Sequence, residues 1–265
     1  MSFLTLDRVS HHYFSKDNYT KALNSITLSI KEGEFVALLG PSGCGKSTLL
    51  SIIAGIIQQT EGKVLLQGHA VGESEMDIGY MLQQDYLFPW KTIIDNVLLG
   101  PKINNNHTEK LKNQAIQLLD EVGLQNVSEK YPNELSGGMR QRVALVRTLI
   151  NDPKILLLDE PFSALDYQTK LNLEDLVADL LKSYHKTAIL VTHDIGEAIA
   201  MSDRIFMMDA NPGTIAKVYD VPIELRNEVP FMVRRHPKYQ ILFDKIWDEL
   251  ETKESDKKAV EIPNE

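Results

Sequence analysis

The chain has 265 residues, 43% of them hydrophobic, and a formal net charge of −9 at pH 7. This composition is sufficient for a substantial buried core and argues against a disordered chain. The acidic balance argues against non-specific binding to a nucleic-acid backbone, which needs a basic surface, and the single cysteine, Cys44, excludes an internal disulfide.

The N-terminal sequence indicates no targeting segment. Its first residues, MSFLTLDRVS, alternate apolar and polar side chains and lack the apolar stretch of a signal peptide. No apolar run approaches the roughly 18 residues that are needed to span a bilayer. We therefore expect a cytoplasmic protein whose membrane role, if it has one, depends on a partner.

The first third of the chain has strand character. Residues 3–9, 25–30 and 62–67 predict an antiparallel layer, with strict period two at Ile26, Leu28 and Ile30. Between them, the apolar run 34–39 ends in a glycine-rich turn that leads into a predicted helix over 47–57. This is a strand, loop and helix unit.

Helices and short apolar strands alternate further along the chain. Residues 95–123 and 137–150 are predicted to be mainly helical, and 155–158 and 188–192 are predicted buried strands with a helix between them. The alternation favours a mostly parallel sheet with helices on both faces. Beyond Asp220 we predict one amphipathic helix over 239–250 and a frayed polar tail over 251–265.

The glycine-rich turn fits the phosphate-loop pattern G-x-x-x-x-G-K-[ST]. Backbone N–H groups of such a loop converge on phosphate oxygens, the lysine reaches the outer phosphates, and the following hydroxyl ligates Mg²⁺. The predicted nucleotide-binding residues are Gly40, Pro41, Ser42, Gly43, Cys44, Gly45, Lys46, Ser47 and Thr48, with Ser47 as a metal ligand. ATP and Mg²⁺ are the implied cofactors.

Two carboxylates follow the apolar strand over 155–158. Asp159 and Glu160 should emerge at the carboxyl end of the sheet, where open α/β folds bind ligands. We expect Asp159 to hold the metal through water and Glu160 to act as general base toward the attacking water. The alternative is that two acids simply end a strand and face solvent.

Leu135-Ser136-Gly137-Gly138 lies at a predicted helix start, where serine caps well and free N–H groups attract anions. With the phosphate loop, Gln83, Ser163-Ala-Leu-Asp166 and His193, this order resembles the nucleotide-binding subunit of ABC transporters over roughly residues 3–215. One departure is Met139, where the family usually carries glutamine.

The resemblance implies a P-loop NTPase core with an N-terminal antiparallel β subdomain and an inserted helical subdomain at about 86–151. The ATPase domain would cover 1–220 and a C-terminal extension 221–265. It implies a head-to-tail dimer in which ATP lies between the phosphate loop of one copy and Ser136, Gly137 and Gly138 of the other. Asp166 would link the copies.

Further site residues follow from the same resemblance. Tyr13 would stack on adenine, although a buried strand-end tyrosine is the alternative. Gln83 would sense the metal and the attacking water, with Gln84 as a weaker candidate. His193 should emerge beside Glu160 and contact the γ-phosphate, so the catalytic set is Glu160, His193, Gln83 and Lys46.

The aromatic segment Tyr86-Leu-Phe-Pro-Trp90 either marks a docking surface or anchors a loop. In the family this region, near residues 83–90, receives a helix of the membrane permease. Leu-Phe-Pro-Trp and the segment 234–239 resemble the importer branch for nitrate, sulfonates, taurine, bicarbonate and thiamine-precursor pyrimidines. A solute-binding protein would then be an indirect partner, and this chain itself would lie in the cytoplasm, peripheral on the inner face of the cell membrane.

Four alternatives are weighed against this importer hypothesis. An exporter subunit is the serious one, although many exporters fuse the cassette to transmembrane segments. A soluble ABC ATPase of translation or DNA repair usually has two cassettes or a long coiled coil. A P-loop kinase or GTPase has no place for the LSGG element, and a non-hydrolysing scaffold would not need Lys46, Glu160 and His193 together.

Overall fold

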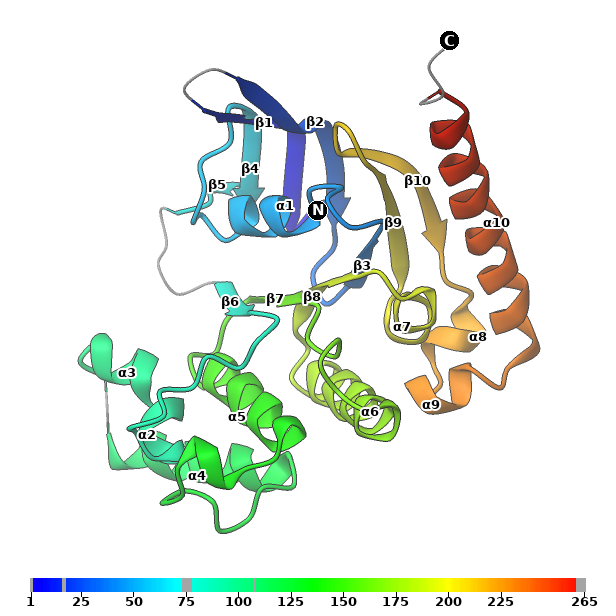
Figure 1. The fold of residues 1–265 in the computed structure, drawn as a ribbon. Helices are drawn as coiled ribbons and strands as arrows, with labels where there is room; N and C mark the ends of the chain where they lie inside the picture. Colours follow the sequence, from blue (N-terminus) through cyan, green and yellow to red (C-terminus); the bar gives the residue numbers. More distant parts are fainter. Residues whose placement is uncertain (1, 16–17, 73–77, 107, 261–265) are drawn as a thin grey trace.

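A computed structural model describes residues 2–15, 18–72, 78–106 and 108–260 (Figure 1). Its central sheet has the strand order β10-β9-β3-β8-β7-β6, and only the β10–β9 pair is antiparallel. This confirms the predicted mostly parallel sheet. The strands are β3 (Phe35–Leu39), β6 (Ile78–Met81), β7 (Ile155–Asp159), β8 (Thr187–Thr192), β9 (Arg204–Asp209) and β10 (Thr214–Asp220).

A second, antiparallel sheet has the order β2-β1-β4-β5 and confirms the predicted N-terminal layer. Residues 25–30 of β2 alternate exposed and buried side chains, as expected when one face packs on the core and the other faces solvent. They are β1 (Leu4–Phe14), β2 (Tyr19–Ile30), β4 (Glu61–Leu66) and β5 (His69–Ala70).

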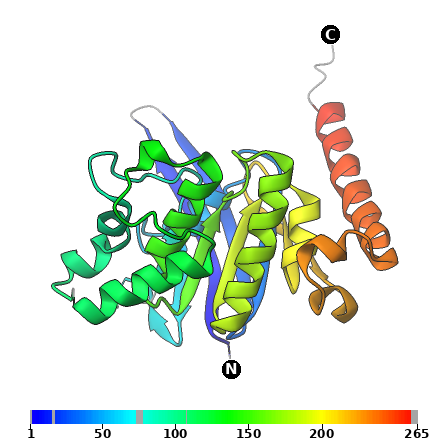
Figure 2. The same cartoon turned by 90° about the horizontal axis from the view of Figure 1, so that it is seen from below.

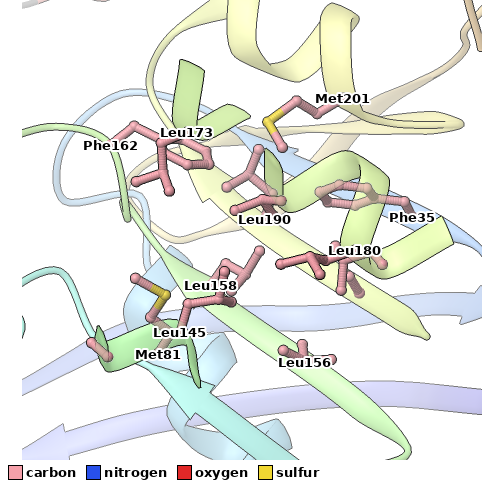
Figure 3. Packing of buried hydrophobic residues seen from close by; sticks show 14 of the residues in the cluster. Phe35, Met81, Leu145, Leu156, Leu158, Phe162, Leu173, Leu180, Leu190 and Met201 are labelled. Carbon is pink, nitrogen blue, oxygen red and sulfur yellow. The ribbon is translucent and has the colours of Figure 1, made fainter. Parts of the chain in front are cut away.

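Helices cover both faces of the central sheet. On one face, α1 (Lys46–Ile53) shares a core with the antiparallel sheet and with Leu157 and Val191 of the strands. On the other face, α5 (Gly137–Leu149), α6 (Tyr167–Ser183) and α7 (Ile195–Met201) pack on the alternate strand residues, among them Leu158 and Leu190 (Figure 3). Buried on both faces, the strands read as continuous apolar runs.

The remaining helices of the middle segment gather beyond the β6 edge of the sheet (Figures 1 and 2). This is the part of the chain where we predicted a helical subdomain. Thr92 and Thr108 cap two of these helices through their side chains. The elements are α2 (Ile93–Val97), α3 (Leu99–Ile103), α4 (Glu109–Glu121) and the 3₁₀ turn η1 (Pro132–Glu134).

Two predictions of local structure were wrong. The helix after the phosphate loop ends at Ile53 rather than at residue 57, because the chain turns at Gly55 with a φ of 72°. The C-terminal helix α10 spans Pro237–Val260, so residues 251–260 are helical rather than frayed. That segment is rich in Glu and Lys, which favour helix. Residues 261–265 lie outside the described part of the chain.

β6, β9 and β10 lie outside the predicted strands. Their sequences carry glycine, methionine and charged residues, so the local pattern is weak. β6 pairs with β7 and β9 pairs with β3, and these contacts with neighbouring strands stabilise them. Two short helices, α8 (Ile223–Arg226) and α9 (Pro230–Val233), likewise precede α10 without having been predicted.

A buried ion pair attaches the C-terminal extension to the core. Arg234 Nη2 lies 2.6 Å from Glu174 Oε2 of α6, although the two groups are not aligned as a hydrogen bond. The Glu174 side chain has no exposed surface. Burial raises the pKa of Glu174 from 4.5 to about 7, against the opposing effect of Arg234.

This raised pKa predicts a pH-dependent stability. Between about pH 4.5 and 7 the folded state binds the Glu174 proton and the unfolded state releases it, so the free energy of unfolding falls as pH rises. Because glutamine does not titrate, the free energy of unfolding of Glu174→Gln should fall less between these pH values, by up to about 3 kcal/mol, than that of the wild type. Urea unfolding of both proteins at pH 4.5 and 8 measures it, and parallel pH profiles would contradict it.

Candidate active site

The phosphate loop joins β3 to α1. The Lys46 ammonium donates hydrogen bonds to the carbonyl oxygens of Gly40 and Pro41, at 2.7 and 2.9 Å. Gly45 has a φ of 91°, and a Cβ there would lie 2.6 Å from Leu23 Cδ2. Glycine is required at this position for both reasons. The loop therefore curls around its own lysine at the N-terminus of α1.

Cys44, the other side chain buried in this loop, has its Sγ 3.7 Å from Lys46 Nζ. Burial raises the pKa of the Cys44 thiol, although the nearby Lys46 opposes the shift. The thiol is therefore kept in its neutral form and packs as a small apolar group.

Asp159 ends β7 opposite the start of α1. Its Oδ1 accepts a hydrogen bond from Ser47 Oγ at 3.1 Å, and its Oδ2 accepts one from the Tyr80 hydroxyl at 3.3 Å. Burial raises the pKa of Asp159 and that of Tyr80, the latter to about 12. Tyr80 lies in β6, a strand that the sequence did not predict, so no sequence signal pointed to it.

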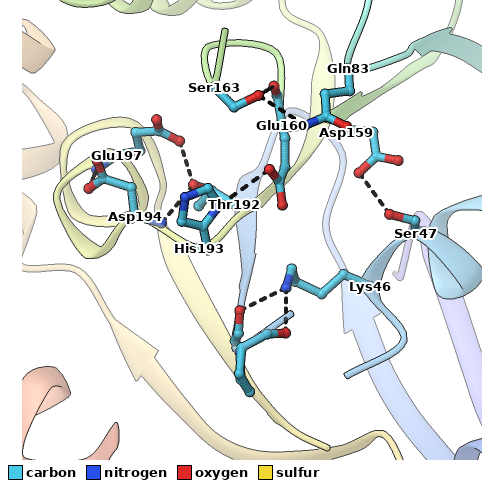
Figure 4. Close-up of polar contacts among 12 residues, drawn as sticks. Lys46, Ser47, Gln83, Asp159, Glu160, Ser163, Thr192, His193, Asp194 and Glu197 are labelled. Atoms are coloured by element: carbon cyan, nitrogen blue, oxygen red, sulfur yellow. Dashed lines mark hydrogen bonds and ion pairs between the residues drawn. The ribbon is translucent and has the colours of Figure 1, made fainter. Parts of the chain in front are cut away.

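Glu160 and His193 meet at the ends of adjacent strands. Glu160 Oε2 lies 3.3 Å from His193 Nδ1, and both side chains point toward the space beside Lys46 (Figure 4). The Glu160 N–H donates to Val191 O at 3.0 Å, and Glu160 has a φ of 46°. Such left-handed backbone is costly for a non-glycine residue and is concentrated at functional sites.

Gln83 reaches the same region from the segment after β6. Its Nε2 donates to Ser163 Oγ at 3.2 Å, and Ser163 Oγ in turn donates to the backbone oxygen of Glu160 at 3.0 Å. Gln141 of α5 holds the Gln83 backbone through a 3.0 Å hydrogen bond to its carbonyl. Gln83 is thus two hydrogen bonds away from Glu160, through a serine that we had assigned no role.

Tyr13 lies near the end of β1 and leans over the start of α1. Its hydroxyl is 3.3 Å from Thr48 Oγ1, and its ring meets His11 edge-on at 4.6 Å between centroids. The Tyr13 side chain is 44% exposed, so it is not a buried strand-end residue. An exposed ring beside the phosphate loop is suited to stacking on a base.

The Ser-Gly-Gly element lies away from the phosphate loop. It starts α5, on the face of the sheet opposite α1, and Ser136 caps that helix by accepting from Met139 N–H at 3.4 Å. A Cβ on Gly138 would lie 2.5 Å from Thr169 Cγ2, in the first turn of α6. Asp166 caps α6 and is exposed. One chain therefore does not bring Ser136 to Lys46.

The donor chemistry at Ser47 and Asp159 fits Mg²⁺, which prefers one or two carboxylates and completes its shell with water and phosphate oxygens. The Gln83 side chain lies on the same side of the site as Asp159 (Figure 4). Within the described residues, no group of three or more His, Cys, Asp or Glu side chains could hold a metal alone.

Comparison with known proteins identifies the family. The family model described as ABC transporter matches residues 23–163. The ABC transporter ATP-binding protein YtlC of Bacillus subtilis, named as uncharacterized, is 58% identical over 96% of this chain and 98% of its own length. The taurine import ATP-binding protein TauB of Roseobacter denitrificans is 38% identical over 94% and 95% of the two chains.

Two further similarities bear on sequence and structure. The aliphatic sulfonates import ATP-binding protein SsuB of Bacillus licheniformis is 39% identical over 94% of each chain. A dimeric, post-hydrolysis structure of the ATP-binding cassette MJ0796 with ADP and Pi has a TM-score of 0.73 at 32% identity, covering 83% of this chain and 99% of that one.

Among the described residues, no helix is both long and apolar enough to cross a bilayer. The phosphate loop, the strand-end carboxylates and the sheet that aligns them agree with the matches in sequence and in fold. The chain therefore belongs to the ABC transporter family and is one of its ATP-binding proteins, an ATPase.

Proposed function

We propose that this protein is the ATP-hydrolysing subunit of an ABC importer for small anionic or organic solutes such as taurine, sulfonates, nitrate or thiamine-precursor pyrimidines. The hydrolysis mechanism rests on the 3.3 Å contact between Glu160 and His193, which lie at the carboxyl ends of β7 and β8 near Lys46 (Figure 4). The importer assignment is supported by the taurine and sulfonate import names of relatives that match nearly the whole chain.

Binding of ATP would redirect the lysine of the phosphate loop. Lys46 donates to two carbonyl oxygens of its own loop, and phosphate oxygens are stronger, charged acceptors for the same ammonium. The loop N–H groups and the N-terminus of α1 add further positive potential toward the phosphates. Tyr13 would hold the base.

Hydrolysis would proceed at the strand ends. Glu160 takes a proton from the attacking water, and His193 orients Glu160 and contacts the γ-phosphate. Mg²⁺, when bound, neutralises charge on the phosphate oxygens, and Ser47, Asp159 and Gln83 are the residues that would hold it. The Gln83–Ser163 contact would relay the metal's presence to the Glu160 backbone.

A second copy would complete each site. The helix N-terminus at Ser136 is an anion-binding element, and it lies on the face of the sheet opposite α1 and its phosphate loop. In a head-to-tail dimer it would face the γ-phosphate that is held by Lys46 of the other copy, and Asp166 would lie between the copies. The dimeric state of the similar cassette MJ0796 supports this arrangement.

The docking surface proposed for the membrane permease is the segment 83–90. Buried Asn96 holds this segment: its Oδ1 accepts from Phe88 N–H at 2.7 Å, and its Nδ2 donates to three carbonyl oxygens. Leu87 is buried, whereas Tyr86 and Trp90 are 58% and 70% exposed. Two aromatic side chains on a rigid loop favour a docking surface over a loop anchor.

Glu160→Gln tests the general base. The variant should bind ATP as tightly as the wild type and hydrolyse it about 10²-fold or more slowly, because glutamine keeps the shape of glutamate and cannot take a proton. Nucleotide binding by fluorescence titration and phosphate release measure the two effects. Lys46→Ala is the matched comparison, since it should weaken binding itself. Near-normal turnover of Glu160→Gln would place the base elsewhere.

Tagged Glu160→Gln protein tests the transport role in its native host. From detergent-solubilised membranes with ATP and Mg²⁺ it should co-purify with a multi-pass permease and a solute-binding protein, identified by mass spectrometry. A permease without a solute-binding protein would point to an exporter. Recovery only from the soluble fraction, with ribosomal or repair proteins, would overturn the transport role.

The docking surface has its own test in that experiment. Adding Trp90→Ala should remove the permease from the purified material without changing the ATP affinity of the isolated subunit, because Trp90 lies on the exposed face of the loop. Adding Ile241→Ala, which alters a residue 69% exposed on α10, serves as the control. Equal permease recovery with both changes would contradict the assignment.

A further inference from the structure

Three buried or partly buried hydrogen bonds hold the backbone around His193. Thr192 Oγ1 donates to Glu197 Oε2 at 2.5 Å and accepts from Asp194 N–H at 2.9 Å. Asp194 Oδ1 accepts from Glu197 N–H at 3.1 Å. Thr192 and Glu197 are buried, so these bonds form where few waters compete. The residues on both sides of His193 are therefore fixed by one pair of carboxylates.

Two carboxylates so close together would repel each other without a cation. Lys170, in the first turn of α6, supplies one: its Nζ lies 2.7 Å from Asp194 Oδ2 and 2.5 Å from Glu197 Oε1. Burial disfavours the charge on both partners, yet their pairing raises the pKa of Lys170 and lowers that of Asp194. Both groups are therefore charged at neutral pH.

The Lys170 ammonium contacts the turn after His193 rather than the reacting groups themselves. It contacts the carboxylates on either side of Ile195 and Gly196, while the His193 imidazole turns the other way, toward Glu160 (Figure 4). In the described part of the chain, the ion pairs of Lys170 are with Asp194 and Glu197, and neither partner belongs to the phosphate loop. An effect of these two ion pairs on hydrolysis would therefore pass through the turn that carries His193.

We propose that Lys170 is a positioning residue for His193. By neutralising Asp194 and Glu197 it keeps the 192–194 turn in the one conformation that brings the imidazole to Glu160. This inference rests on the catalytic role proposed for His193. The device is a partly buried ammonium that two carboxylates share behind the catalytic histidine.

Lys170→Met tests the inference, because methionine keeps the length of the side chain without its charge. We expect kcat for ATP hydrolysis to fall by about 10-fold or more, since small misplacements of catalytic groups have effects of this order, while the KM for ATP stays within about 2-fold. Lys170→Arg restores a cation between the carboxylates and should recover most of kcat. An unchanged kcat in Lys170→Met would overturn the proposal.

A double variant separates positioning from general damage. In the His193→Ala background, Lys170→Met should cause no further loss of kcat, because there is no imidazole left to position. A further loss equal to that in the wild-type background would overturn the proposal. A normal kcat for His193→Ala alone would instead overturn the role of His193 in the proposed function, so the two failures are distinguishable.

A control variant shows whether the loss of any similar ion pair would lower kcat. Lys186→Met is the matched control: Lys186 pairs with Asp152 at 2.5 Å just beyond the other end of α6, with a side chain 13% exposed against 17% for Lys170. It should leave kcat unchanged.

Thr192→Val is the second variant, for the case that thermal unfolding shows Lys170→Met not to fold. It removes the hydroxyl that joins Glu197 to Asp194 N–H and should give the same loss of kcat. A normal kcat in Thr192→Val would overturn the proposal.

Discussion

The active site depends on the parallel register of three neighbouring strands. β3 pairs with β8, and β8 pairs with β7, so that Leu39 lies beside Thr192 and Asp159 beside Val191. The carboxyl ends of the three strands therefore lie side by side at one edge of the sheet, and residues more than a hundred positions apart in the sequence meet there. The packing of α1 on one face and of α5 and α6 on the other holds this edge in place.

Charge at that edge is stabilised by pairing rather than by solvent. Lys46 is buried and held by carbonyl oxygens, and Asp159 accepts hydrogen bonds from a serine and a tyrosine. Behind His193, Lys170 lies between two carboxylates. Buried charges with such partners are costly to disturb, because removing one partner leaves the other unpaired. The left-handed backbone of Glu160 adds local strain where the chemistry is proposed.

One helix connects the separate parts of the molecule. The first turn of α6 carries Asp166, Thr169 against Gly138, and Lys170 against the turn of His193. Half-way along, Glu174 meets Arg234 of the C-terminal extension, and α10 follows from there past the cleft beside Pro41 and His193. The Ser-Gly-Gly element, the turn that carries His193 and the C-terminal extension are thus all in contact with α6.

The sequence by itself determined the fold class, the phosphate loop and the strand-end position of Asp159, Glu160 and His193, because these depend on local patterns: a glycine-rich turn and apolar strands that end in polar residues. The tertiary structure alone decided the rest. Tyr80 reaches Asp159 from a strand whose own pattern is weak, and Lys170 meets Glu197 only because α6 and α7 pack together. Likewise the length of α10 was underestimated from its polar sequence. Contacts between distant segments have no local periodicity, so they became visible only in the folded chain.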